Sequence, residues 1–204
     1  NSLAVLRDIP GIILACPSDG ADATKMLREC VRLAREEQRV VVFIEPIALY
    51  GMRDLHGDKD GGWTRRYPAR HERIALGEVG VTGEGPLAIL TYGNGHFLSQ
   101  QAGPILADQG IATRIIDMRW LAPMPEAGIL AALNGAQKVL VVDECRRSGN
   151  QSEAIMTFLD ETCDLPKSRI TAMDSFIATG PAYGATMPSR DSIVAAATAL
   201  WGAT

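Results

Sequence analysis

The stretch from residue 86 to residue 125 constrains the fold of this chain most strongly. Residues 87–92 form a short apolar run that stops at Gly93, apolar residues then recur at helical spacing as far as Gly110, and residues 112–118 form a second apolar run. A strand, a helix and a strand of these lengths make a βαβ unit, in which the two strands are parallel. Because the segments on either side repeat the alternation, we expect this unit to be the centre of a parallel sheet.

The flanking segments supply further strands and helices. We expect a short strand and turn within 73–84 and a turn at 121–125. The predicted fold class is α/β, with an open, mainly parallel sheet of about four or five strands and helices on both faces. The other predicted strands are 12–16, 40–44, 138–142 and 169–173, and the other predicted helices are 21–37, 126–133, 152–161 and 192–201.

The predicted helix over 21–37 has a clear amphipathic pattern. Ser18 or Asp19 precedes it as the expected N-cap. Apolar residues at i, i+3 and i+4 spacing define the face that we expect to point inward. This face comprises Ala23, Met26, Leu27, Cys30, Val31 and Ala34.

A polar stretch over 50–72, rich in glycine and charge, separates the two strand–helix regions. Its composition is typical of a linker between domains, and its glycine-rich ends suggest a loop that reaches a neighbouring active site. The predicted division is therefore an N-terminal part over 1–46, a linker loop over 47–72 and a C-terminal domain over 73–204.

Charge and composition argue against several classes of partner. The net charge is −4 and the pI is about 5.4, whereas proteins that neutralise nucleic-acid phosphates cluster Lys and Arg. No apolar run approaches the roughly 18 residues of a membrane-spanning helix. The four cysteines are scattered without C-x-x-C spacing, so we expect neither a zinc site nor a disulfide framework and favour a cytoplasmic protein. Since the chain begins at Asn1 and not at Met, we expect a piece of a longer protein.

The sequence contains three histidines that could take part in proton transfer. His56 in the linker loop is the catalytic candidate, because imidazole titrates near neutral pH. A solvated side chain is the plainer reading for His56 and for His71, which lies at the end of the same loop. His96 lies where the central helix begins.

Residues at predicted strand ends give further candidates. The Gly-Asn-Gly sequence at 93–95 suits a phosphate at a helix N-terminus, but Leu98 breaks the G-x-G-x-x-G pattern, so we favour a tight turn with positive φ. Cys145 stands beside two arginines, which can lower a thiol pKa, yet we favour an ion-paired interface loop over 143–147. Glu45 either orients a loop on a cofactor or, as we prefer, is a structural acid bonded to backbone amides.

Five segments, taken in order, carry a resemblance to a known family. With them the chain resembles the beta subunit of thiamine diphosphate-dependent 2-oxo acid dehydrogenases, the decarboxylating first components of the pyruvate and branched-chain complexes. Transketolase shares the same two domains. The fourth segment, with its D-x-R and L-x-P, is the most distinctive. The segments are PGIILACPSDGADATKMLRECV, VVVFIEPIALY, LAILTYGNG, GIATRIIDMRWLAPMP and KVLVVDE.

The resemblance implies a division of labour between this chain and residues outside it. Residues 1–46 would be the C-terminal remnant of a pyrimidine-binding domain, and residues 73–204 a transketolase C-terminal-type domain. Thiamine diphosphate and magnesium would be bound mostly outside these residues, and the catalytic residues would precede Asn1. We therefore expect no catalytic or cofactor-binding residue here beyond the candidate His56, and no activity from this piece alone.

The resemblance also implies ion and partner sites. The family binds potassium near the end of the helix before VVVFIEP, and the matching positions are Ala34, Glu37 and Arg39. Because an arginine would repel a cation, we expect no metal there. Asp164, two residues before Pro166, matches the acid with which the family docks the lipoyl acyltransferase component. The other implied partner is an alpha subunit, or the N-terminal half of the same enzyme, in a homodimer or heterotetramer.

Two alternatives stay open beside decarboxylation of a 2-oxo acid with acyl transfer to a lipoyl carrier. One is a transketolase-type ketol transfer, for which Arg65, Arg66 and Arg70 could hold a sugar phosphate, although the acidic pI gives this little support. The other is a non-catalytic interaction module for dimerisation and docking.

Overall fold

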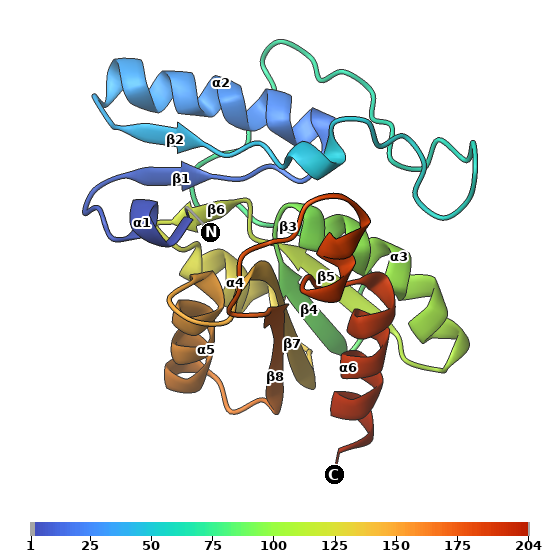
Figure 1. Ribbon diagram of the computed structural model, residues 1–204. Helices are drawn as coiled ribbons and strands as arrows, with labels where there is room; N and C mark the ends of the chain where they lie inside the picture. The colour runs from blue at the N-terminus through green and yellow to red at the C-terminus, as the bar shows by residue number, and fades with distance from the viewer. Residues whose placement is uncertain (1–2, 204) are drawn as a thin grey trace.

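Two sheets of different size make up the fold (Figure 1). The computed structural model describes residues 3–203. In the view of Figure 1, the smaller sheet and helix α2 lie above the larger sheet, which has helices on either side. The elements in chain order are α1 Leu3–Arg7, β1 Ile13–Ala15, α2 Gly20–Glu36, β2 Val41–Phe43, η1 Ile47–Leu49, β3 Gly80–Thr82, β4 Leu87–Thr91, α3 Asn94–Asp108, β5 Thr113–Asp117, β6 Trp120–Ala122, α4 Glu126–Ala132, β7 Lys138–Arg146, α5 Gln151–Thr162, β8 Lys167–Ala172, η2 Gly180–Ala185 and α6 Arg190–Gly202, where η marks a short 3-10 helix.

The larger sheet has five strands in the order β3-β5-β4-β7-β8, of which the edge strand β3 is antiparallel and the others are parallel. Along β4, Leu87 and Ile89 face the core shared with α3 and α6, whereas Ala88 and Leu90 face the core shared with α4 and α5. All four side chains are fully buried, as expected of a central parallel strand that is covered on both faces. The predicted α/β class, with helices on both faces of a mainly parallel sheet, is confirmed.

The smaller sheet joins the start of the chain to its middle. Strands β1 and β2 are parallel and connected by α2, as the sequence predicts. The third strand, β6, pairs antiparallel with β1 and sets Trp120 opposite Ala15. The turn predicted at 121–125 is therefore wrong at its start. Three residues close to Pro123 are too few to indicate a strand, and it is the tertiary pairing with β1 that extends them.

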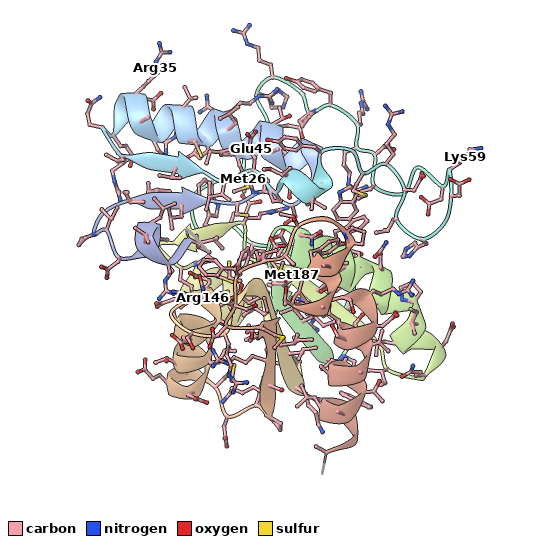
Figure 2. The ribbon with its side chains drawn as sticks, in the orientation of Figure 1. Met26, Arg35, Glu45, Lys59, Arg146 and Met187 are labelled. Atoms are coloured by element: carbon pink, nitrogen blue, oxygen red, sulfur yellow. The ribbon has the colours of Figure 1, made fainter. Side chains whose placement is uncertain are left out.

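Helix α2 packs on the smaller sheet through a face that differs from the predicted one. Met26, Cys30 and Leu33 are buried against β1, but Leu27 and Val31 are 49% and 46% exposed. Ala34 is exposed as well. Figure 2 shows Met26 on the sheet side of α2 and Arg35 projecting from the opposite side.

Two paired acids take the remaining inner positions of α2. Asp22 and Glu29 are 8% and 5% exposed, and each carboxylate binds an arginine, Arg119 and Arg32 respectively. An acid with a partner can be buried where hydrophobicity alone would place an apolar residue, and this rotates the buried face away from Leu27.

Residues 50–72, here called the strap, are held against both helices that they cross. Trp63 is 4% exposed, and its ring packs edge-on against Phe97 of α3 with the ring centroids 4.9 Å apart. Gln101 of α3 donates a hydrogen bond to a strap carbonyl at 2.7 Å, and Arg28 of α2 donates to carbonyls near the end of the strap at 3.1 and 3.3 Å. Figure 2 shows that its tip, at Lys59, projects away from the body.

Two strands that follow the central βαβ unit have bounds that differ from the predicted ones. Strand β7 continues past the expected end at 142 as far as Arg146, and β8 begins at Lys167 and not at Arg169. No helix within residues 3–203 is long and apolar enough to cross a membrane.

Candidate functional site

The carboxyl ends of the parallel strands in the two sheets meet at one junction. A Cβ placed on Gly93, which follows β4, would lie 3.2 Å from Cys16 Sγ after β1 and 3.3 Å from Pro46 Cγ after β2. Open α/β sheets bind ligands at carboxyl ends where successive connections diverge, and β4, flanked by β5 and β7, is such a point. Gly93 is buried, so the ends of β1 and β2 cover this crevice.

The predicted tight turn at 93–95 is present at Gly93. This residue is the N-cap of α3 and has φ +55°, a conformation that L side chains rarely adopt. The close neighbours and the positive φ both favour glycine here. The presence of glycine is therefore explained without a bound phosphate.

A buried phenol–carboxylate pair lies at the junction. Tyr92 Oη donates to Asp143 Oδ1 at 2.6 Å. The same carboxylate accepts the backbone N–H groups of Cys145 at 2.8 Å and of Ser152 at 2.9 Å. Burial, then the charge of Asp143, raises the pKa of Tyr92 well above its ordinary value. The ion-paired loop predicted over 143–147 is therefore wrong at Asp143, whose partners are a phenol and backbone amides.

Cys145 has a raised thiol pKa, contrary to the reading from its two neighbouring arginines. Burial, then the charge of Asp143, raises the pKa of Cys145 to about 11. The arginine next to it, Arg146, donates its Nε–H to the Ser148 carbonyl at 3.1 Å. At neutral pH the thiol stays protonated, so its environment does not make it a nucleophile.

A second buried acid, Asp117, ends β5. Burial raises the pKa of Asp117, while His96, Ser18 and Arg119 oppose that rise. The Arg119 backbone N–H donates to Asp117 Oδ1 at 3.3 Å, and its guanidinium turns to Asp22 of α2. This polar group ties the end of the larger sheet to the first turn of α2.

Two glutamates near the junction have contrasting environments. Glu45 is exposed and accepts the Tyr50 hydroxyl at 2.8 Å, so the predicted structural acid bonded to backbone amides is wrong. The chain turns into η1 directly after it and presents a phenol there, not backbone N–H groups. Glu144 is half-buried, and the loss of solvent around its carboxyl raises its pKa, while hydrogen bonding to Asn94 opposes the rise.

The structure separates the three histidines. His56 and His71 are exposed on the strap, and the His56 backbone N–H donates to Asp60 Oδ2 at 2.7 Å. His96 is 8% exposed, and its ring centroid lies 5.8 Å from that of Trp63. The catalytic candidate His56 is thus on the surface, while the buried histidine adjoins the junction.

The residues predicted for partner docking and for ion binding lie away from the junction between the two sheets. Asp164 is exposed in the loop that enters β8, at the edge of the larger sheet opposite its carboxyl ends. At the end of α2, Glu37 binds Arg32 Nη1 at 2.8 Å, and Ala34 is exposed. The Arg39 backbone N–H donates to the Leu33 carbonyl at 3.1 Å. Within residues 3–203, no group of three or more His, Cys, Asp or Glu could hold a metal ion.

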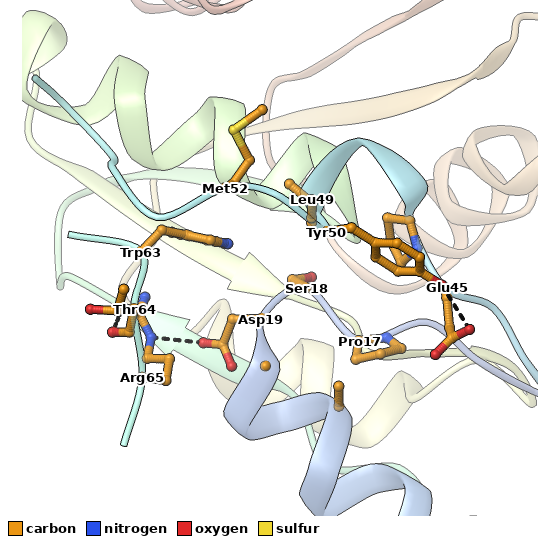
Figure 3. Close-up of a pocket in the computed structure, with 13 residues that line it drawn as sticks. Pro17, Ser18, Asp19, Glu45, Leu49, Tyr50, Met52, Trp63, Thr64 and Arg65 are labelled. Carbon is orange, nitrogen blue, oxygen red and sulfur yellow. Dashed lines mark hydrogen bonds and ion pairs between the residues drawn. The ribbon is translucent and has the colours of Figure 1, made fainter. Parts of the chain in front are cut away.

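A pocket of about 410 Å³ lies between the start of α2, η1 and the strap. Figure 3 shows Ser18 in its middle, with Trp63, Thr64 and Arg65 on one side and Tyr50 and Glu45 on the other. Asp19, the confirmed N-cap of α2, accepts the Asp22 N–H at 2.9 Å with Oδ1 and the Arg65 Nε–H at 2.9 Å with Oδ2. The remaining lining residues are Pro17, Gly20, Ala23, Pro46, Leu49 and Met52.

Sequence reasoning named Ser18 only as a helix cap and did not single out Trp63 or Arg119. A lone tryptophan in a polar, glycine-rich loop is a signal that could have indicated an anchored strap. No local pattern marks Arg119, because its partner Asp22 is remote in the sequence.

Two sheets of an α/β fold define the class of this protein: the larger has four parallel strands and one antiparallel edge strand, with a covered crevice at the carboxyl ends of its parallel strands. The sequence profile of the family described as "Transketolase, C-terminal domain" matches residues 77–193. The chain belongs to the transketolase C-terminal domain family.

Similarity to named proteins extends beyond the residues that the family profile matches. The chain is 25% identical over 199 residues to the pyruvate dehydrogenase E1 component subunit beta of Staphylococcus aureus, which covers 95% of this chain and 57% of that protein. It is 27% identical over 176 residues to the 2-oxoisovalerate dehydrogenase subunit beta of Bacillus subtilis, which covers 84% of this chain and 50% of that protein. The resemblance seen in the sequence is confirmed, and the chain spans about half the length of these relatives.

A solved structure described as "Split gene transketolase, inactive beta4 tetramer" has the same fold. The TM-score is 0.76 at 21% identity, and the superposition covers 98% of this chain and 61% of that one.

Proposed function

We propose that this chain is part of the beta subunit of a thiamine diphosphate-dependent 2-oxo acid dehydrogenase. The intact enzyme would decarboxylate a 2-oxo acid and transfer the acyl group to a lipoyl carrier in the cytoplasm. The observation that supports this most is the similarity to a named beta subunit along 95% of the chain, which includes both sheets. Its partners would be an alpha subunit, in a heterotetramer, and a lipoyl acyltransferase that contacts Asp164.

The described residues supply little of the cofactor site. Thiamine diphosphate provides the carbanion chemistry and needs a cation for its diphosphate. Within residues 3–203 no metal-binding cluster is present, and the one arginine that lines the pocket, Arg65, is engaged by Asp19. These residues do not fit a diphosphate–magnesium group, so we derive no reaction step from them and assign them support and docking.

Substrate profiling of the complete protein tests the proposal. With thiamine diphosphate, Mg²⁺ and an artificial electron acceptor, we expect reduction that depends on pyruvate or a branched-chain 2-oxo acid. Ketol transfer between sugar phosphates without 2-oxo acid oxidation would favour the transketolase alternative. Turnover by residues 1–204 alone would overturn the assignment of a supporting role.

A further inference from the structure

We propose that the pocket between α2, η1 and the strap binds a small, planar organic cation that carries N–H donors, such as an amidinium on an aromatic ring. Its volume of about 410 Å³ lies within the range of about 300–1,000 Å³ that small-molecule sites occupy. No function derived above uses this pocket.

An orphan hydroxyl marks the pocket as a built site. Ser18 is 2% exposed, and its Oγ has no hydrogen-bond partner of good geometry among the described residues. The Ser18 oxygen is therefore left able to accept a hydrogen bond from a ligand, and leaving it unmet in a buried position costs free energy.

Two side-chain donors of the pocket, on Arg65 and Tyr50, are already engaged, and two of its oxygens are free to accept. Arg65 donates Nε–H to Asp19, and its Nη1 donates to the carbonyls of Gly62 at 2.9 Å and Thr64 at 3.1 Å. The Tyr50 hydroxyl donates to one oxygen of Glu45, Oε2, which leaves the other oxygen of that exposed carboxylate for a ligand. A ligand that meets the free oxygens of Ser18 and Glu45 must therefore bring its own N–H groups.

Charge selects a cation over an anion. The lining residues include two carboxylates, Asp19 and Glu45, and one guanidinium, Arg65, which leaves one excess negative charge. The start of α2 would ordinarily attract an anion, but the Asp19 carboxylate already occupies that position and accepts the Asp22 N–H.

The walls suit a flat apolar body. Trp63 is held by Phe97 behind it and by the Arg65 guanidinium 4.9 Å from its ring centroid, so its position is fixed before a ligand arrives. Leu49 and Met52 line the pocket together with this ring. A rigid aromatic wall with aliphatic side chains beside it favours a planar ligand at low entropic cost.

Three probes of one shape test the proposal by calorimetry on the purified protein. Benzamidine, benzamide and benzoate share a ring and differ in charge. We expect benzamidine to bind with a Kd of about 1 mM or tighter and benzoate at least about tenfold more weakly. Equal binding of benzoate, or no heat from benzamidine at tens of millimolar, would overturn the proposal.

Variants locate the binding. Glu45→Gln removes an exposed charge, so we expect it to weaken the binding of benzamidine about five- to tenfold and to leave the binding of benzamide unchanged. Ser18→Ala should weaken the binding of both benzamidine and benzamide, because each donates N–H groups. The matched control Glu161→Gln, at an exposed position of α5, should change neither. Benzamidine binding that survives Glu45→Gln and Ser18→Ala would place it outside this pocket and reject the site.

Discussion

Arg119 and Asp22 form a largely buried ion pair that joins the two sheets. The Arg119 Nε and Nη2 atoms lie 2.8 and 2.6 Å from Asp22 Oδ2, and the two side chains are 14% and 11% exposed. Arg119 links β5 to β6, while Asp22 lies in the first turn of α2. The contact therefore ties the helix of the smaller sheet to the larger sheet.

We expect Arg119→Gln to lower the free energy of unfolding by about 2–3 kcal/mol, because Asp22 keeps a buried charge and retains only Lys25 at 3.1 Å. Urea denaturation measures this change. The matched control is Arg190→Gln, whose pair with Asp191 is exposed and should contribute less than about 1 kcal/mol. Equal effects at the two sites would mean that the inter-sheet pair adds no stability.

Gly93→Ala should destabilise the junction more than a simple loss of glycine does. The new Cβ would contact Cys16 and Pro46 within 3.3 Å at a φ of +55°, so both strain and overpacking contribute, about 3 kcal/mol together. Gly110→Ala is the control, since its φ is +76° but nothing lies within 4 Å of its Cβ, and we expect about 1 kcal/mol. Thermal unfolding compares them, and a cost at Gly93 no larger than at Gly110 contradicts the close contact.

Trp63→Ala should release the strap. Removing the ring takes away the contact with Phe97 and the wall of the pocket, and large-to-small changes at buried aromatic sites cost about 3–5 kcal/mol. Limited trypsin digestion should then cut faster at Arg53 and Lys59. Tyr67→Ala, at a side chain that is 75% exposed, should leave the digestion rate unchanged, and a strap that stays resistant without Trp63 must be anchored by something else.

Acid should loosen the tip of the strap through Asp60. Its carboxylate accepts the backbone N–H groups of Leu55, His56, Gly57 and Gly62, and these bonds hold the pKa of Asp60 well below its usual value. A depressed folded-state pKa contributes stability above the unfolded value of about 3.9 and loses it as the pH falls through the folded value.

Amide exchange of the strap measures this contribution. At neutral pH we expect Asp60→Asn to speed exchange at Gly57 and Gly62, whereas Asp58→Asn, on an exposed neighbour, should not. In the wild type, the same amides should lose protection only well below pH 4. Protection that is already lost at pH 5 would show that another group controls the loop.

The sequence predicts the larger sheet well because its apolar runs are long and buried on both faces, as along β4. Strand β6 is not predicted, because its three residues are held extended by pairing with β1. The predicted buried face of α2 includes Leu27 because Asp22 and Glu29 would be expected to face solvent, whereas both are buried. The thiol of Cys145 differs from its sequence-based interpretation for a similar reason, because Arg146 donates to the Ser148 carbonyl and burial raises the thiol pKa. Tertiary partners decide these points, and local patterns do not contain them.

The proposed function is tested most directly by coupling decarboxylation to acylation in the complete enzyme. With a 2-oxo acid, thiamine diphosphate, Mg²⁺ and a lipoyl domain, CO₂ release and acylated lipoyl domain should appear in equal amounts. If a full panel of 2-oxo acids releases no CO₂ and leaves the lipoyl domain unmodified, the chain is not part of a 2-oxo acid dehydrogenase.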